Sequence, residues 1–141
     1  MTRTTRTGMK ARGGPLAVAG ALGAASLALV AVPAYAKGDV DVTAPHTAHV
    51  GETFTVTAHG DDDAVRYLRM CLQQRGGGDA WRQVACGAVV ASGTEARAAA
   101  HVKDARRGPV EFRAVMYGLT NPSDHHPVRW RMSDPVTVHV R

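Results

Sequence analysis

The chain has 141 residues, and 17 lysines and arginines against 12 aspartates and glutamates give it a formal net charge of +5 at pH 7. Four of the basic residues and none of the acidic ones precede Lys37, so the remainder carries 13 − 12 = +1. The basic excess therefore belongs to the first 36 residues, and it does not indicate a nucleic-acid-binding protein.

Residues 1–36 have the pattern of an export signal. Basic residues come first, an uncharged, helix-compatible run of Ala, Leu and Val extends over 15–32, and small residues precede Lys37 with A-x-A spacing. We expect cleavage between Ala36 and Lys37, with membrane contact only during export and secretion of 37–141 as one domain. An uncleaved membrane anchor stays open as an alternative, because the apolar run is about as short as a membrane span can be.

From residue 39 onward, short segments alternate apolar and polar residues between turn residues, as half-buried β-strands do. The first predicted strands cover 39–43, ended by Pro45, and 53–58. In the second of these, Phe54, Val56 and Ala58 share one face, which we expect to be buried.

The middle of the chain predicts a hairpin, with a strand after Ala64, a glycine-rich break over 73–79 and a second strand over 81–90. The break separates Cys71 from Cys86 almost symmetrically. In an oxidising compartment an even cysteine count favours a disulfide. A free pair or a metal site is the alternative, although the spacing is unlike that of zinc ligands.

The simplest register of this hairpin pairs Cys71 with Cys86, Leu72 with Ala85, and Gln73 with Val84. It places a core face on one side, made of Leu68, Met70, Leu72, Ala85 and Val89. We expect the disulfide on the opposite side beside Arg69, partly exposed. A single β-bulge would invert these faces.

Alanines alternate with polar residues over 94–102, where period two favours a strand although alanine itself favours a helix. Further strands are predicted over 110–117, 128–132 and 136–140, with a surface loop over 118–127. The whole pattern predicts an all-β fold, an antiparallel β-sandwich of about seven to eight strands.

The order of elements resembles bacterial immunoglobulin-like domains of secreted and cell-surface proteins. The residues that carry the resemblance are Val40, Val42, Pro45, Gly51-Glu52, Phe54, Val56, Ala58, Gly108, Val110, Phe112-Arg113-Ala114, Ser133, Pro135-Val136, Val138 and Val140. The resemblance implies an immunoglobulin-like sandwich, but with the disulfide inside one hairpin and Phe112 where such domains have a corner tyrosine. Cys71, Cys86 and Gly93 also resemble the short disulfide-closed hairpin of enediyne-antibiotic apoproteins.

Three groups of residues could carry chemistry. Asp61–Asp63 could ligate calcium, or form a solvated turn. His125-His126 could bind a transition metal with His59 or His101, or simply face water. Ser92, Ser123 and Ser133 lie in turns without the surroundings of a nucleophile, so we expect no catalysis, no metal and no cofactor.

Arginines and aromatic residues on the predicted strands could instead form a binding face, since such side chains anchor interfaces by stacking and bidentate pairing. The residues chosen for this face are Arg69, Trp81, Arg82, Arg129, Trp130 and Arg131, with Arg66, Tyr67, Arg113 and Tyr117 as further candidates. The alternative is that ordinary arginines cover strand surface with their stems.

These observations lead to one main hypothesis and two alternatives. The main one is a non-catalytic extracellular interaction module that binds a protein or a glycan. The first alternative is a small-ligand carrier similar to the enediyne apoproteins, with an apolar pocket between its sheets. The second is an inhibitor of a secreted hydrolase, which would insert the loop 118–127 into a cleft.

Overall fold

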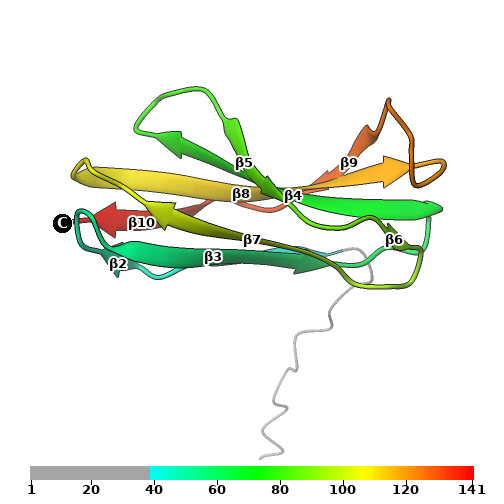
Figure 1. Cartoon of the computed structure of the whole chain (residues 1–141), viewed down its shortest axis with the longest axis horizontal. Coiled ribbons are helices and arrows are strands. Elements are labelled where there is room, and N and C mark those ends of the chain that lie inside the picture. Colours follow the sequence, from blue (N-terminus) through cyan, green and yellow to red (C-terminus); the bar gives the residue numbers. More distant parts are fainter. Residues whose placement is uncertain (1–38) are drawn as a thin grey trace, which may run out of the picture. The chain divides into compact units, whose positions relative to one another are not determined.

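A computed structural model describes residues 39–141, so the predicted export signal, with its cleavage site between Ala36 and Lys37, lies outside the described residues. The described part is all-β, with ten strands in two sheets. Figure 1 shows the sheets as two layers. Within residues 39–141 there is no helix long and apolar enough to cross a membrane.

The smaller sheet has three strands in the order β1-β3-β7. These are β1 (Val40–Thr43), β3 (Thr53–Gly60) and β7 (Ala96–Lys103). The larger sheet has seven strands, with β2-β10-β8-β4-β5 in order, β6 beside β4 and β9 beside β8. Its members are β2 (Thr47–Ala48), β4 (Tyr67–Gly76), β5 (Arg82–Cys86), β6 (Val90–Ala91), β8 (Gly108–Leu119), β9 (Val128–Met132) and β10 (Val136–Val140).

This arrangement is consistent with the predicted sandwich but corrects it in two respects. The predicted strand over 81–90 is divided into β5 and β6, and β2, which was not predicted, pairs with β10 in parallel, so the larger sheet is not wholly antiparallel. Pro45 lies between β1 and β2. Because proline has no N–H to donate, it favours the end of β1 there, and the chain leaves the smaller sheet for the larger one.

The alternation of side chains in the strands confirms the predicted core. Phe54, Val56 and Ala58 of β3 are buried, and in β7 the buried side chains are Ala96, Ala98, Ala100 and Val102. The alanine-rich segment is therefore a strand, because pairing with all eight residues of β3 outweighs the helical preference of alanine. Phe54 and Phe112 pack edge to face across the two sheets, with ring centroids 5.9 Å apart.

The central hairpin has the predicted disulfide between Cys71 and Cys86, and Leu72 pairs with Ala85 as expected. The predicted pairing of Gln73 with Val84 is wrong, because the register shifts after Leu72 and Gln73 faces Gln83. This bulge lies beyond the core residues, so it does not invert the faces. Cys71 is buried and Cys86 is partly exposed, which agrees with the partly exposed disulfide that we expected.

The second strand of the hairpin is shorter than predicted. It ends at Cys86, and Gly87 bonds through its N–H to the Met70 carbonyl at 2.8 Å before the chain reaches β6. A Cβ at Gly87 would lie 1.6 Å from the Arg97 carbonyl oxygen, so only glycine allows the chain to pass β7 here. After this crossing Val90, rather than Val89, packs against the core.

Candidate functional site

The strands β4 and β8 form the longest pairing in the larger sheet and present two different faces. Their inner face supplies core residues such as Met70 and Phe112. The alternate residues lie on the outer face, which points away from the smaller sheet. In Figure 1, β5 and β9 rise on this outer side, near opposite ends of the sheet.

Arginines and aromatic residues come into register on the outer face. Arg69 of β4 pairs with Tyr117 of β8, which in turn pairs with Arg129 of β9. Farther along β8, Arg113 pairs with Gln73, and Glu111 with Arg75. We call the set made of Arg69, Arg75, Trp81, Arg113, Tyr117 and Arg129 the arginine–aromatic face.

Contacts between the side chains order one end of this face. The guanidinium carbons of Arg75 and Arg113 lie 4.4 Å and 4.3 Å from the centre of the Trp81 ring, within cation–π range. Arg75 also donates to Glu111 at 2.5 Å, and Arg113 donates to the amide oxygen of Gln73 at 2.7 Å. Trp81 is therefore held by arginines of two strands that are already paired.

The arginine–aromatic face carries a net positive charge. Arg69, Arg75, Arg113 and Arg129 lie on it, but among its paired rows only Glu111 is acidic, and that carboxylate bonds to Arg75. Burial lowers the pKa of Arg113, and the positive charges of Arg129 and Arg75 lower it further. Within residues 39–141, Arg113 and Arg129 have no carboxylate partner, so an anion placed here would relieve repulsion between them.

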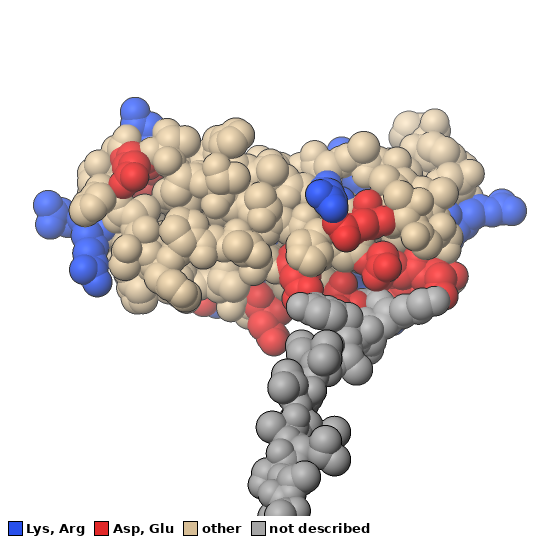
Figure 2. Space-filling view, turned by 90° about the horizontal axis from the view of Figure 1, so that it is seen from below, with Lys and Arg blue, Asp and Glu red and all other residues tan. Residues whose placement is uncertain are grey.

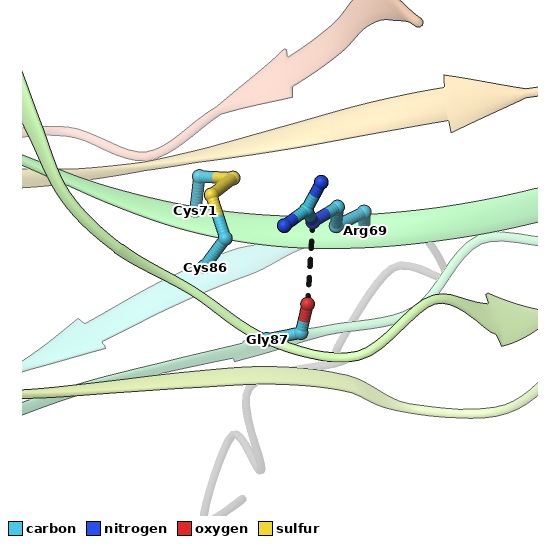
Figure 3. The surroundings of a disulfide bond; sticks show 4 residues. All are labelled: Arg69, Cys71, Cys86 and Gly87. Carbon is cyan, nitrogen blue, oxygen red and sulfur yellow. Dashed lines mark hydrogen bonds between the residues drawn. A yellow bond between two sulfur atoms is a disulfide. The ribbon is translucent and has the colours of Figure 1, made fainter. Parts of the chain in front are cut away.

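The disulfide and its neighbours support the middle of the face. Cys71 pairs with Val115 of β8, and Val115 pairs with Met132 of β9. Val115 is fully buried although it lies outside the main core, while Met132 is about half exposed. Figure 3 shows Arg69 beside the disulfide, donating to the Gly87 carbonyl at 3.3 Å. The disulfide thus ties β5 to the centre of the outer face.

The structure divides the six residues that the sequence singled out for a binding face. It places Arg69, Trp81 and Arg129 on the outer side of the sheet. Arg82 pairs with Gln74 and lines a polar cavity of about 220 Å³ together with Arg75 and Lys103. Trp130 and Arg131 bond to Asp62 instead. Arg75 was missed, because it lies in the segment expected to be a turn.

Asp62 is an anchor inside the fold, so the expectation of a solvated turn is wrong for this residue. Its side chain is about 3% exposed, and it accepts hydrogen bonds from Trp130 Nε1 at 3.0 Å and Arg131 Nε at 2.6 Å. The N–H of Ala64 donates to it as well, at 2.7 Å. The carboxylate therefore fixes β9 to the turn between β3 and β4.

Replacing Asp62 by asparagine should destabilise the protein by about 2 kcal/mol, because the charge-assisted bonds to Arg131 and Trp130 are weakened. Burial by itself raises the pKa of Asp62, but the bonds from Ala64, Arg131 and Trp130 together lower it below the ordinary value. A lowered pKa stabilises the fold above the unfolded pKa of about 3.9, and this contribution is lost as the pH falls through the folded pKa.

Urea unfolding of the two proteins at a series of pH values measures this contribution. The difference in unfolding free energy should be largest at neutral pH and should shrink below about pH 4, as protonation removes the carboxylate charge from the original protein. Asp61→Asn is the matched control, since Asp61 is exposed. A difference that persists unchanged at acid pH would contradict the anchoring role of the charge.

An apolar pocket of about 410 Å³ lies where β8 and β9 meet the turn before β4. The residues that line it are Val65, Arg66, Gly118, Leu119, Thr120, Asp124, His126, Val128 and Trp130. Val128 and Trp130 are 62% and 42% exposed, so β9 presents apolar surface to this pocket. None of these residues belongs to the arginine–aromatic face.

Three of the serines and histidines that the sequence singled out make contacts within the fold. Ser133 accepts a hydrogen bond from the Ala114 N–H through its hydroxyl, and the Ser92 hydroxyl donates to the Asp62 carbonyl. His101 contacts the hydroxyl of Thr55 on the outer side of the smaller sheet. Within residues 39–141, no three or more histidines, cysteines and carboxylates form a group that could hold a metal ion.

The outer side of the smaller sheet differs from the arginine–aromatic face. Figure 2 shows a broad area without charged residues there, with acidic side chains gathered near the start of the described chain. The exposed positions of β3 are three threonines and His59, and Arg97 of β7 is paired with Glu95. The two broad sides of the domain therefore offer different chemistry to a partner.

Comparisons with protein-family models and with curated proteins give no match to this chain.

Proposed function

We propose that the protein is a secreted, non-catalytic interaction module with an immunoglobulin-like fold, which binds an acidic extracellular protein or glycan through the arginine–aromatic face. The observation that carries this proposal is the pair Arg113 and Arg129, two guanidinium groups near each other that lack a carboxylate partner in the described part of the chain. Guanidinium groups bind carboxylates, sulfates and phosphates through paired hydrogen bonds.

The aromatic residues of the face add to this recognition. Trp81 and Tyr117 provide flat apolar surface beside the arginines, and such residues dominate binding energy at protein interfaces. The position of Trp81 is fixed by Arg75 and Arg113, so little side-chain entropy would be lost on binding. The disulfide supports secretion, because such bonds persist in oxidising compartments.

The double variant Arg113→Gln with Arg129→Gln tests the proposal. The full chain is exported from a host cell and immobilised, secreted and wall fractions are passed over it, and mass spectrometry identifies what is retained. We expect one acidic partner, bound at least about tenfold more weakly by the double variant, because two charge-assisted contacts are lost. Added salt should weaken the original complex in the same direction.

Arg97→Gln is the matched control, because it removes an arginine from the opposite side of the domain and leaves the arginine–aromatic face unchanged. Thermal unfolding of all three proteins shows whether the double variant is still folded. Equal retention of the partner by the folded double variant would refute this face as the binding site. Turnover of a substrate without any retained partner would refute the interaction module itself.

The two alternatives stay predictions. A carrier was expected to have its pocket between the sheets, but fully buried side chains such as Val56, Leu68 and Phe112 pack there, and the apolar pocket lies beside β9. A hydrolase inhibitor was expected to insert the loop 118–127. The carboxylate of Asp124 accepts hydrogen bonds from Thr120 and His126 within this loop, which gives it a compact form.

A further inference from the structure

The pocket beside β8 and β9, here called the hairpin pocket, has the size of a small-molecule site. Its volume of about 410 Å³ falls in the range of about 300–1,000 Å³ typical of ligand pockets. Four apolar side chains, those of Val65, Leu119, Val128 and Trp130, contribute to its lining. Three of the four exposed large apolar residues of the described chain lie on β9, and two of these line the pocket. An exposed apolar patch of this kind marks a binding site.

The indole of Trp130 is held in position for a ligand. Its Nε1 donates to the buried carboxylate of Asp62 at 3.0 Å, and Arg131, the next residue in the strand, donates to the same oxygen. Trp130 is nonetheless 42% exposed as a residue, and it lines the pocket. A fixed and accessible indole face attracts cations, since its π-system has negative charge above the ring.

The pocket also contains a fixed negative charge. One oxygen of Asp124 accepts from the N–H and the hydroxyl of Thr120, both at 3.1 Å, and the other accepts from the His126 N–H at 2.8 Å. The bond from the Thr120 N–H, followed by that from His126, lowers the pKa of Asp124, so the group is ionised at neutral pH. A carboxylate held in this way is preorganised for a positively charged ligand.

Arg66 is the opposing charge at the pocket. Its guanidinium has no hydrogen-bond or ion-pair partner in the described structure and the residue is exposed, so it is not held in place as Asp124 and Trp130 are. The two fixed groups therefore favour a cation, while the one unfixed group favours an anion. Because fixed groups lose less entropy on binding, the cation is the better match.

We propose that the hairpin pocket binds a small organic cation, an amine or ammonium group on an apolar ring, with the charge at Asp124 and the ring against Trp130 and Val128. This site shares no residue with the arginine–aromatic face, and the inference does not rest on the partner proposed above.

Three probes of the same shape and different charge test the proposal: 2-phenylethylammonium, 3-phenylpropanoate and the neutral 2-phenylethanol. Calorimetry measures their binding to the full exported chain. Trp81→Phe leaves Trp130 as the one remaining tryptophan of the chain, so its fluorescence reports occupancy of the pocket. We expect the ammonium to bind about tenfold more tightly than the propanoate and to change Trp130 emission.

Two charge variants separate the roles of the pocket residues. Asp124→Asn should weaken ammonium binding about fivefold, and Arg66→Gln should leave it unchanged or tighten it, because a repelling charge is removed. If the loop rearranges in Asp124→Asn, the Arg66→Gln result and the ranking of the three probes still decide the question. Arg113→Gln with Arg129→Gln should not affect the ammonium, which separates failure here from failure of the partner proposal.

Several results would overturn the inference. These are a propanoate that binds as tightly as the ammonium, ammonium binding that Arg66→Gln weakens, and the absence of heat and of any change in Trp130 emission at millimolar ammonium. The first would show that the pocket does not favour a cation, and the second that Arg66 does not act as a repelling charge in it. The third would show that the pocket is a surface hollow without a small-molecule function.

Discussion

Replacing Phe112 by alanine should destabilise the protein by about 4 kcal/mol, the largest effect that we expect from a single core substitution. Phe112 is fully buried and lies on β8, with Gln74 of β4 on one side and Val136 of β10 on the other. Its ring also meets Phe54 of the other sheet edge to face, at an interplanar angle of 86°. Because paired strands hold β8 on both sides, the surroundings cannot collapse to fill the cavity, and the truncation loses contacts between both layers.

Equilibrium unfolding in urea, followed by circular dichroism, measures this loss. Phe112→Leu is the matched control, expected to cost only about 1 kcal/mol because it preserves most of the buried volume. Tyr117→Ala removes a ring from the outer side of the same strand and should also cost less, since Tyr117 is only partly buried. If alanine at position 112 proved no worse than leucine there, the packing of the two sheets around this ring would be refuted.

The core could be predicted from sequence because strand alternation is a local property. In β3 and β7 every second residue is buried, and these are the apolar ones. The alanine-rich segment had conflicting signals, since composition favoured a helix and periodicity a strand. Pairing with β3 along its full length decided for the strand, because tertiary packing overrides intrinsic propensity.

The glycine-rich break could not be predicted in detail, because its conformation depends on a distant strand. The expected turn began at Gln73, yet β4 continues to Gly76 because β8 pairs with it as far as Val110. This extension places Arg75 opposite Glu111 and beside Trp81. The same long-range pairing turns Arg75 into a member of the arginine–aromatic face, which no local pattern indicated.

The sequence identified only some of the site residues, because the site also depends on long-range strand pairing. Composition suggested that arginine and aromatic side chains would cluster, but which of them meet depends on register, bulges and the sides from which the strands approach. Trp130 lies at a register shift between β8 and β9, and it reaches Asp62, which is 68 residues away in the sequence. The three aspartates of that turn look equivalent in the sequence, and only one of them is buried.

Removing the disulfide by Cys71→Ala with Cys86→Ala should destabilise the protein by about 3 kcal/mol, because the bond closes a loop with a sequence separation of 15 residues. A small domain has a total stability of only about 5–15 kcal/mol, so this is a substantial fraction. The effect should exceed that of the controls at exposed positions, Asp61→Asn and Arg97→Gln, because Cys71 is buried between β5 and β8 and its removal also leaves space in the outer layer.

The loss of protection against hydrogen exchange should be largest in β5, which lies at the edge of the sheet and pairs with β4 alone. Without the disulfide we expect hydrogen exchange to accelerate most in residues 82–86, while β3 and β7 lose only the protection that corresponds to the lower global stability. Reduction of the original protein should reproduce this pattern, which separates loss of the bond from the change of side chain. If Trp81 then leaves Arg75 and Arg113, partner binding should fall together with protection of β5. Unchanged protection in β5 would contradict the idea that the disulfide stabilises this face. An equal loss of protection in all strands would show that the disulfide stabilises the fold as a whole.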